Sequence, residues 1–350
     1  MIKKIINTVI LAVLSVVYTF AQTPTPQPSP TQMDTTISKP GQINLPRQSG
    51  TDVSKLLITT TLETILTEAG KQTANYREAF KNLLATETKT YERYDKNGDE
   101  KDRTVIESNF FVYQSSKDEN VSSELRNIVK VDGKLVPEGQ ARADRFLAEL
   151  QKSKTVENEL EKIQDEGSRY DKSLETSGLT LFEAFVLTDK LRPYFDFKLL
   201  GSENYQGNEV FIVSYQQMKK SPFIKINEKK SKEKDVKANN FDANLPGSLK
   251  KTDTFLRGKL WIDARTYQLR REEQQLTVQT ADPLIASETI FEYQPSEYEI
   301  LVPKQISLLY NSIKKASKNN QFNAVKDTKI TFDYSQFKKS EVDVQIVDEP

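Results

Sequence analysis

Strict alternation of apolar and polar residues dominates the second half of the chain. Beyond Pro193 the apolar positions recur every second residue, most clearly over 305–311, 330–335 and 341–346. Strands with one apolar and one polar face are typical of antiparallel sheets that are buried on one side only. Such runs, counted together with the turn signals between them, predict about eleven strands. The pattern therefore indicates an α+β fold built on one large, curved antiparallel sheet.

Helical spacing of apolar residues is confined to the part of the chain before Pro193. It extends from Val53 to Leu84 and predicts an N-terminal helix that is interrupted at Gly70. A charge-dense stretch with one apolar stripe predicts a second helix over 137–165. A short apolar helix is expected over 179–191, ended by Pro193, which lacks a backbone donor. We expect these helices to pack on the concave face of the sheet.

The segment DKNGDE at 95–100 has two interpretations. An EF-hand loop that began at Asp95 would need Gly at its sixth position and Glu at its twelfth, but those positions hold Glu100 and Ile106. Asn97-Gly98, between runs rich in β-branched and aromatic residues, instead predicts the tip of a hairpin. Adventitious surface calcium is the alternative. Further turns are predicted at 132–133, 206–208 and 264–266.

The N-terminal 50 residues predict an exported chain. Residues 1–21 combine two lysines, a short apolar stretch and a small-residue end, which is the pattern of a signal peptide cleaved after Ala21. The alternative, an uncleaved anchor, would give a short membrane span. Residues 22–50 form a Pro/Thr-rich disordered linker before a domain over 51–350. We therefore expect a periplasmic or secreted protein, and the absence of cysteine excludes disulfides.

The charge balance argues against nucleic acid as a partner. Fifty Lys and Arg residues are matched by fifty Asp and Glu residues, so the chain has no global basic field. The lysines are nevertheless concentrated in an insertion over 219–251. This insertion is interpreted either as a solvated loop or as a surface that docks on anionic lipid headgroups or an acidic partner. In the second interpretation the docking residues are Lys229, Lys230, Lys232 and Lys234.

Catalytic chemistry has few candidate residues. The sequence contains no histidine and no cysteine, which removes the usual general base near neutral pH and the common nucleophile pairs. Four Ser-x-x-Lys matches are too many to be specific, and Glu272 and Glu273 would point to opposite faces of a strand. No glycine-rich phosphate loop or metal-ligand spacing occurs. We expect no enzyme activity, no cofactor and no metal site.

Several motifs along the chain resemble exported bacterial proteins of the outer-membrane lipoprotein-sorting type, the LolA/LolB-like group. The matching segments are YERYDKNG at 91–98, VKVDGKLVP at 129–137, FKLLG at 197–201, YQGNEVFIVSY at 205–215, RGKLWID at 257–263, YQLRR at 267–271 and VPKQI at 302–306. The resemblance implies a half-open β-barrel covered by helices, whose apolar interior holds acyl chains in the carriers.

Two functions follow, depending on whether the interior is hollow. In the first, the protein is a monomeric, non-catalytic carrier for a lipid or lipidated protein of the cell envelope, with peripheral contact to the membrane surface. In the second, it is an envelope scaffold with a solid core that binds protein partners. Periodicity does not separate residues that line a pocket from residues that fill a core. The candidates are Phe211, Val213, Tyr215, Leu260, Ile262, Ile306, Leu308 and Phe332.

Overall fold

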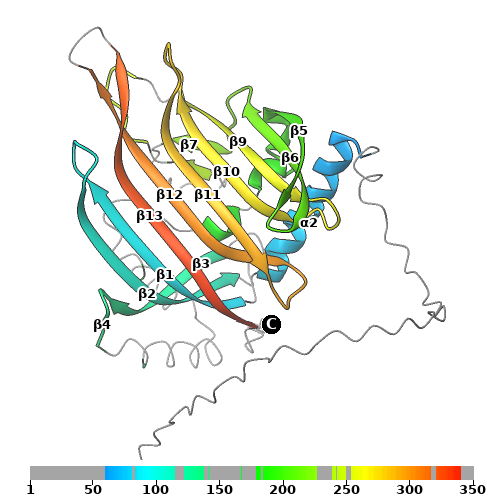
Figure 1. Ribbon diagram of the computed structural model, residues 1–350, viewed down its shortest axis with the longest axis horizontal. Coiled ribbons are helices and arrows are strands. Elements are labelled where there is room, and N and C mark those ends of the chain that lie inside the picture. The colour runs from blue at the N-terminus through cyan, green and yellow to red at the C-terminus, as the bar shows by residue number, and fades with distance from the viewer. Residues whose placement is uncertain are drawn as a thin grey trace, which may run out of the picture. The chain divides into compact units, whose positions relative to one another are not determined.

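Figure 1 presents the structure, a computed structural model of the chain. It describes residues 60–80, 83–114, 122–137, 141, 167, 179–182, 184–226, 239–241, 243–249, 254–316 and 321–339. All of them belong to the second of two compact units, which spans Asp52–Pro350. The predicted signal peptide, the linker, most of the helix predicted over 137–165 and the strand predicted over 341–346 lie outside the described residues.

One antiparallel sheet of eleven strands dominates the described residues. Its order is β4-β3-β2-β1-β13-β12-β11-β10-β9-β6-β5. The strands are β1 (Leu83–Tyr94), β2 (Glu100–Gln114), β3 (Ser122–Val131), β4 (Lys134–Leu135), β5 (Phe195–Tyr205), β6 (Asn208–Gln217), β9 (Thr254–Asp263), β10 (Leu269–Val278), β11 (Leu284–Pro295), β12 (Leu301–Lys315) and β13 (Phe322–Lys339). The sheet is curved and open, with β4 and β5 at its two edges (Figure 1). The predicted sheet is confirmed.

Helical segments cover one face of this sheet, which we call the inner face. They are α2 (Leu62–Phe80) and three short 3-10 turns, η1 (Leu179–Phe182), η2 (Phe185–Leu187) and η3 (Arg192–Tyr194). One side of α2 is buried through Ile65, Leu66, Ala69, Tyr76 and Phe80. The predicted helical layer on the concave face is therefore confirmed. No helix among the described residues combines the length and the apolar run that crossing a bilayer requires.

The N-terminal helix differs from its prediction in three ways. It begins at Leu62, after the non-helical Thr60 and Thr61, it runs through Gly70 without interruption, and it ends at Phe80, so that Leu83 and Leu84 begin β1. A Cβ at Gly70 would lie in ordinary van der Waals contact, 3.4 Å from the carbonyl oxygen of Leu187, so the helix packs against η2 here. Leu83 and Leu84 fit either period, and pairing with β2 and β13 decides in favour of the strand.

The helix predicted over 179–191 is wrong. The segment instead forms η1 and η2, separated at Ala184, whose φ of 40° is left-handed. A continuous helix would pair the backbone N–H of Ala184 with the carbonyl oxygen of Thr180, but that N–H donates to Glu272 on β10 and that carbonyl accepts from the Tyr76 hydroxyl. Tertiary contacts have thus overridden the local helical pattern.

The predicted turns are confirmed. Asp95 begins the β1–β2 turn, and its carboxylate accepts the N–H groups of Asn97 (2.7 Å) and Asp99 (3.1 Å), while Gly98 takes a φ of 90°. The pKa of Asp95 is lowered by these backbone hydrogen bonds. Its oxygens therefore serve the hairpin as turn acceptors. The β5–β6 turn likewise has positive φ at Gln206 and Gly207.

The insertion over 219–251 is not simply a solvated loop. Its described parts include β7 (Ile224–Ile226) and β8 (Asn239–Phe241), which pair in parallel. Apolar residues of these parts pack against the core, namely Phe223, Ile224, Ile226, Phe241, Leu245 and Leu249. The solvated-loop interpretation is wrong for these residues, and Lys229, Lys230, Lys232 and Lys234 lie outside the described ones.

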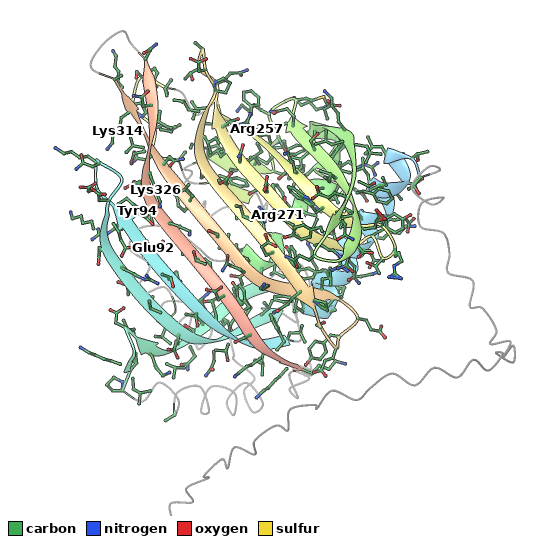
Figure 2. The ribbon with its side chains drawn as sticks, in the orientation of Figure 1. Glu92, Tyr94, Arg257, Arg271, Lys314 and Lys326 are labelled. Atoms are coloured by element: carbon green, nitrogen blue, oxygen red, sulfur yellow. The ribbon has the colours of Figure 1, made fainter. Side chains whose placement is uncertain are left out.

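Cross-strand polar pairs cover the opposite, outer face (Figure 2). Arg257 donates to Gln275 (2.9 Å), which donates in turn to Glu288 (2.7 Å) on β11. Arg271 pairs with Glu273 (2.7 Å) and with Glu292. Pairs of this kind on a solvent-exposed face each contribute little to the free energy of folding. The outer face therefore helps to set the strand register and the solubility more than the stability.

Gly258 on β9 lies opposite Tyr215, and the backbone here leaves no room for a side chain. A Cβ at Gly258 would lie 2.1 Å from the carbonyl oxygen of Glu273 and 2.5 Å from the Tyr215 ring. We expect Gly258→Ala to lower the free energy of unfolding by about 1–3 kcal/mol, measured by urea denaturation. Gly247→Ala, where the added Cβ meets nothing within 4 Å, is the control. Equal losses in both variants would contradict this account.

Candidate functional site

The strand register gathers four of the predicted lining residues into one row across the inner face, which we call the central row. Over seven neighbouring strands, from β6 to β1, it consists of Val213, Leu260, Glu272, Phe291, Ile306, Phe332 and Lys89. Each of these residues is at most 2% exposed. The centre of the inner face is thus apolar, with one carboxyl group in its middle.

The other four predicted lining residues also face inward. Phe211 lies opposite Ile262, and its ring stacks on Tyr267 with 6.4 Å between the centroids. Leu308 and Tyr215 are 3% and 2% exposed. All eight candidates therefore share one buried face. That they line a ligand site stays a prediction.

A charged cluster lies beside the central row, on β1 and β3. Arg126 donates from Nε and from a terminal nitrogen to the two carboxylate oxygens of Glu87, at 2.7 and 2.9 Å, and also donates to Glu124 at 3.0 Å. The guanidinium carbon stands 5.1 Å above the ring of Phe110. Burial acts to lower the pKa of Arg126, but the two carboxylates outweigh it and raise that pKa above its ordinary value. Arg126 therefore keeps its positive charge although it is buried.

The first of two contacts that hold the helical turns joins η1 to this cluster. The backbone N–H and the hydroxyl of Thr180 both donate to Glu124, at 2.6 and 2.7 Å. From the other side, the hydroxyl of Tyr76 on α2 donates to the carbonyl oxygen of Thr180 at 2.8 Å. One residue thus links η1 to β3 and to α2.

The second contact joins Ala184 to the middle of the central row. The backbone N–H of Ala184 donates to Glu272 at 3.0 Å, and the Tyr215 hydroxyl donates to the other oxygen at 2.9 Å. Burial raises the pKa of Glu272 to about 7, although both hydrogen bonds act to lower it. A carboxyl group of this kind changes charge near neutral pH.

We call η1, Ala184 and η2 together the strap. Directly after its second contact, the strap buries Phe185, Val186 and Leu187 to 2%, 0% and 3% exposure. The ring of Phe185 also lies 6.0 Å from that of Phe241 in the insertion. The strap therefore covers the inner face with apolar side chains while two carboxylates hold its backbone.

Sequence reasoning missed the buried charges of the inner face: Glu87, Lys89, Glu124, Arg126 and Glu272. A signal was present for some of them. Glu87 and Lys89 share strand parity with Tyr91, and Glu272 shares it with Leu276. Parity placed Glu272 and Glu273 on opposite faces as predicted, but a charged residue normally identifies the wet face, so the buried one was not recognised.

Comparisons with known proteins found similarity to solved structures only. No protein-family model matches the chain, and no curated protein does. Among solved structures, the chain is similar to an outer membrane lipoprotein-sorting protein domain from Vibrio parahaemolyticus, with 11% identity, a TM-score of 0.33, and coverage of 78% of this chain and 94% of that one. It is also similar to a DUF1329 family protein from Desulfovibrio piger, with 10% identity, a TM-score of 0.35, and coverage of 81% and 95%.

A third similar structure is a LolA superfamily protein from Nitrosomonas europaea, with 10% identity, a TM-score of 0.31, and coverage of 83% of this chain and 98% of that one. The group that the sequence motifs resemble is thus found among the structural matches. At these identities and TM-scores, none of the matches bears on what this chain binds.

The buried cluster predicts an asymmetric response to mutation. Replacing Arg126 by Met leaves Glu87 and Glu124 buried without their cation, so we expect a loss of about 3–5 kcal/mol in the free energy of unfolding. The matched control is Arg93→Met, because Arg93 pairs with Asp102 at 2.7 Å across exposed positions. That variant should lose no more than about 1 kcal/mol. Similar losses measured by denaturant unfolding would show that the cluster does not anchor the fold.

Proposed function

We propose that the protein is an exported, non-catalytic carrier that binds the acyl chains of a lipid or lipidated protein on the inner face, beneath the strap. The observation that carries the proposal is how the strap is attached. It covers the central row with apolar side chains, yet two carboxylates hold its backbone instead of a neighbouring strand. Such a cover can be displaced while the strands keep their own hydrogen bonds.

Replacement of the strap by a ligand on the inner face is energetically favourable only for an apolar ligand. Lifting the strap removes Phe185, Val186 and Leu187 from the inner face and uncovers the central row. Uncovered apolar surface costs about 25 cal/mol per Å² against water. A ligand with an acyl chain restores that burial, whereas a polar ligand does not. The proposal therefore concerns lipids and lipid-modified proteins of the cell envelope.

Two further observations support a binding role without catalysis and outside the cytoplasm. The chain contains no histidine and no cysteine, and the described residues contain no group of three or more metal-ligating side chains that could hold an ion. The predicted signal peptide over 1–21 supports export to the periplasm or outside the cell. Peripheral contact with an anionic membrane through Lys229, Lys230, Lys232 and Lys234 remains part of the proposal.

The competing function is an envelope scaffold with a solid core. The observation in its favour is that the eight candidate lining residues are all at most 3% exposed and contact other protein side chains. If that packing is permanent, no ligand enters, and partners would be bound at the surface. The two functions differ in whether purified protein holds a lipid.

Ligand binding is tested with the exported chain purified without strong detergent. Native mass spectrometry should find co-purified lipid, and a fluorescent fatty acid should bind saturably after extraction. Val213→Phe adds bulk to the central row, so we expect it to weaken probe binding at least about ten-fold, equivalent to about 1.4 kcal/mol. The control is Ile212→Phe, because Ile212 is the next residue on β6 and faces the outer side.

Two results would count against the carrier. One is the absence both of co-purified lipid and of saturable probe binding, which favours the scaffold. The other is equal weakening by the two Phe variants, with both still folded by circular dichroism. That result would place the probe somewhere other than the central row.

A further inference from the structure

The two carboxylates that hold the strap have different surroundings. Glu124 shares the cation of Arg126, whose nitrogen lies 3.0 Å away. Glu272 is 0% exposed, and it accepts hydrogen bonds from a backbone N–H and a phenol. Ionising a buried carboxyl group is unfavourable without a compensating charge. Among the described contacts, a cation therefore faces the carboxylate at one end of the strap and not at the other.

The elements packed around Glu272 confirm this difference. Its neighbours across the sheet are Leu260 on β9 and Phe291 on β11. Tyr215 on β6 is the titratable group in contact with it, and α2 adds Tyr76 to the inner face. Burial raises the pKa of Glu272, and the two hydrogen bonds act against it. Glu183, next to Ala184 in the sequence, lies outside the described residues.

We infer that the strap is a proton-linked latch: it is seated on β10 while Glu272 is protonated, and it is released at Ala184 when this carboxyl group ionises. The seated geometry can also hold the neutral form. One oxygen of a protonated Glu272 still accepts the Ala184 N–H, and the other can donate its proton to the Tyr215 oxygen. The Thr180 end stays attached through Glu124, so that the strap swings instead of leaving.

The direction of the pH effect follows from the two states of Glu272. In the seated state its pKa is about 7, and in water it returns toward the ordinary value of 4.5. The seated state therefore holds the proton more tightly, and acid favours it. As pH rises from about 4.5 to about 7, release becomes up to about ten-fold more favourable per pH unit, and above about 7 it levels off.

This latch extends the proposed function, since it would set when the inner face is open, but its test needs no ligand. The chain contains no cysteine, so a single introduced thiol reports on one place. Val186→Cys puts a thiol where exposure is 0%. The exposed edge residue Leu200, at 55%, provides a reference thiol as Leu200→Cys. The probe is 4,4′-dithiodipyridine, which labels thiols in acid and at neutral pH.

The measured quantity is the labelling rate of Val186→Cys divided by that of Leu200→Cys, which removes the pH dependence of the thiol itself. We expect this ratio to rise by up to ten-fold per unit between about pH 5 and about pH 7 and then to level off. In a Glu272→Gln background, the ratio should not change with pH. A ratio that falls with pH, or that keeps its rise in Glu272→Gln, would overturn the latch.

Two controls isolate the strap. Glu183→Gln should leave the pH dependence of the labelling ratio unchanged. A flat profile in that variant would show that Glu183, and not Glu272, causes the pH dependence. Val112→Cys, at 0% exposure on β2, reports unfolding of the sheet and should label far more slowly than Val186→Cys at every pH. Equal rates would mean that global unfolding, not strap release, exposes the thiol.

If Glu272→Gln fails to fold, Tyr215→Phe tests the same point. It removes a hydrogen bond that lowers the pKa of Glu272, so the levelling-off should move to higher pH. If the pH at which the ratio levels off stays the same or falls, the latch is contradicted. If the labelling ratio rises with pH as expected but no lipid binds, the latch is supported and the carrier function is rejected. If lipid binds but the labelling ratio does not change with pH, the carrier function is supported and the latch is rejected.

Discussion

A backbone N–H group that leaves a helix or strand inside a protein needs an acceptor, and on this inner face two buried carboxylates supply it. Glu124 accepts from Thr180, and Glu272 accepts from Ala184. These contacts allow the short 3-10 turns of the strap to lie on an apolar surface with the N–H groups of Thr180 and Ala184 paired. They also mean that the cover is attached at discrete points, so that its removal does not require any strand to separate from its neighbour.

The sheet supplies what the strap covers. Register alone aligns Val213, Leu260, Glu272, Phe291, Ile306 and Phe332 across neighbouring strands, since each pairs with the next. A row built in this way is rigid, because every member belongs to a strand that is bonded on both sides. We therefore expect the strap to open more readily than the sheet.

The sequence predicted the sheet well because its determinants are local. Asn97-Gly98 and Gln206-Gly207 permit the positive φ values that close hairpins, and alternation assigns residues such as Ile306 and Phe332 to one face. It predicted the strap incorrectly because the deciding partners are distant: Thr180 bonds to a residue 56 positions away, and Ala184 to one 88 positions away. The burial of charged residues such as Arg126 was not predicted for a related reason, since only the fold brings Glu87 within 2.7 Å of Arg126.

The separate stability of the strap is the claim most directly open to measurement. Hydrogen exchange, followed residue by residue at constant pH, compares the amide of Ala184 with the amides of β10. The account predicts that Ala184 exchanges through openings at least about ten-fold more frequent than those of β10, with the sheet still protected. Exchange of Ala184 and β10 at one common rate, set by global unfolding, would contradict a displaceable cover over the inner face.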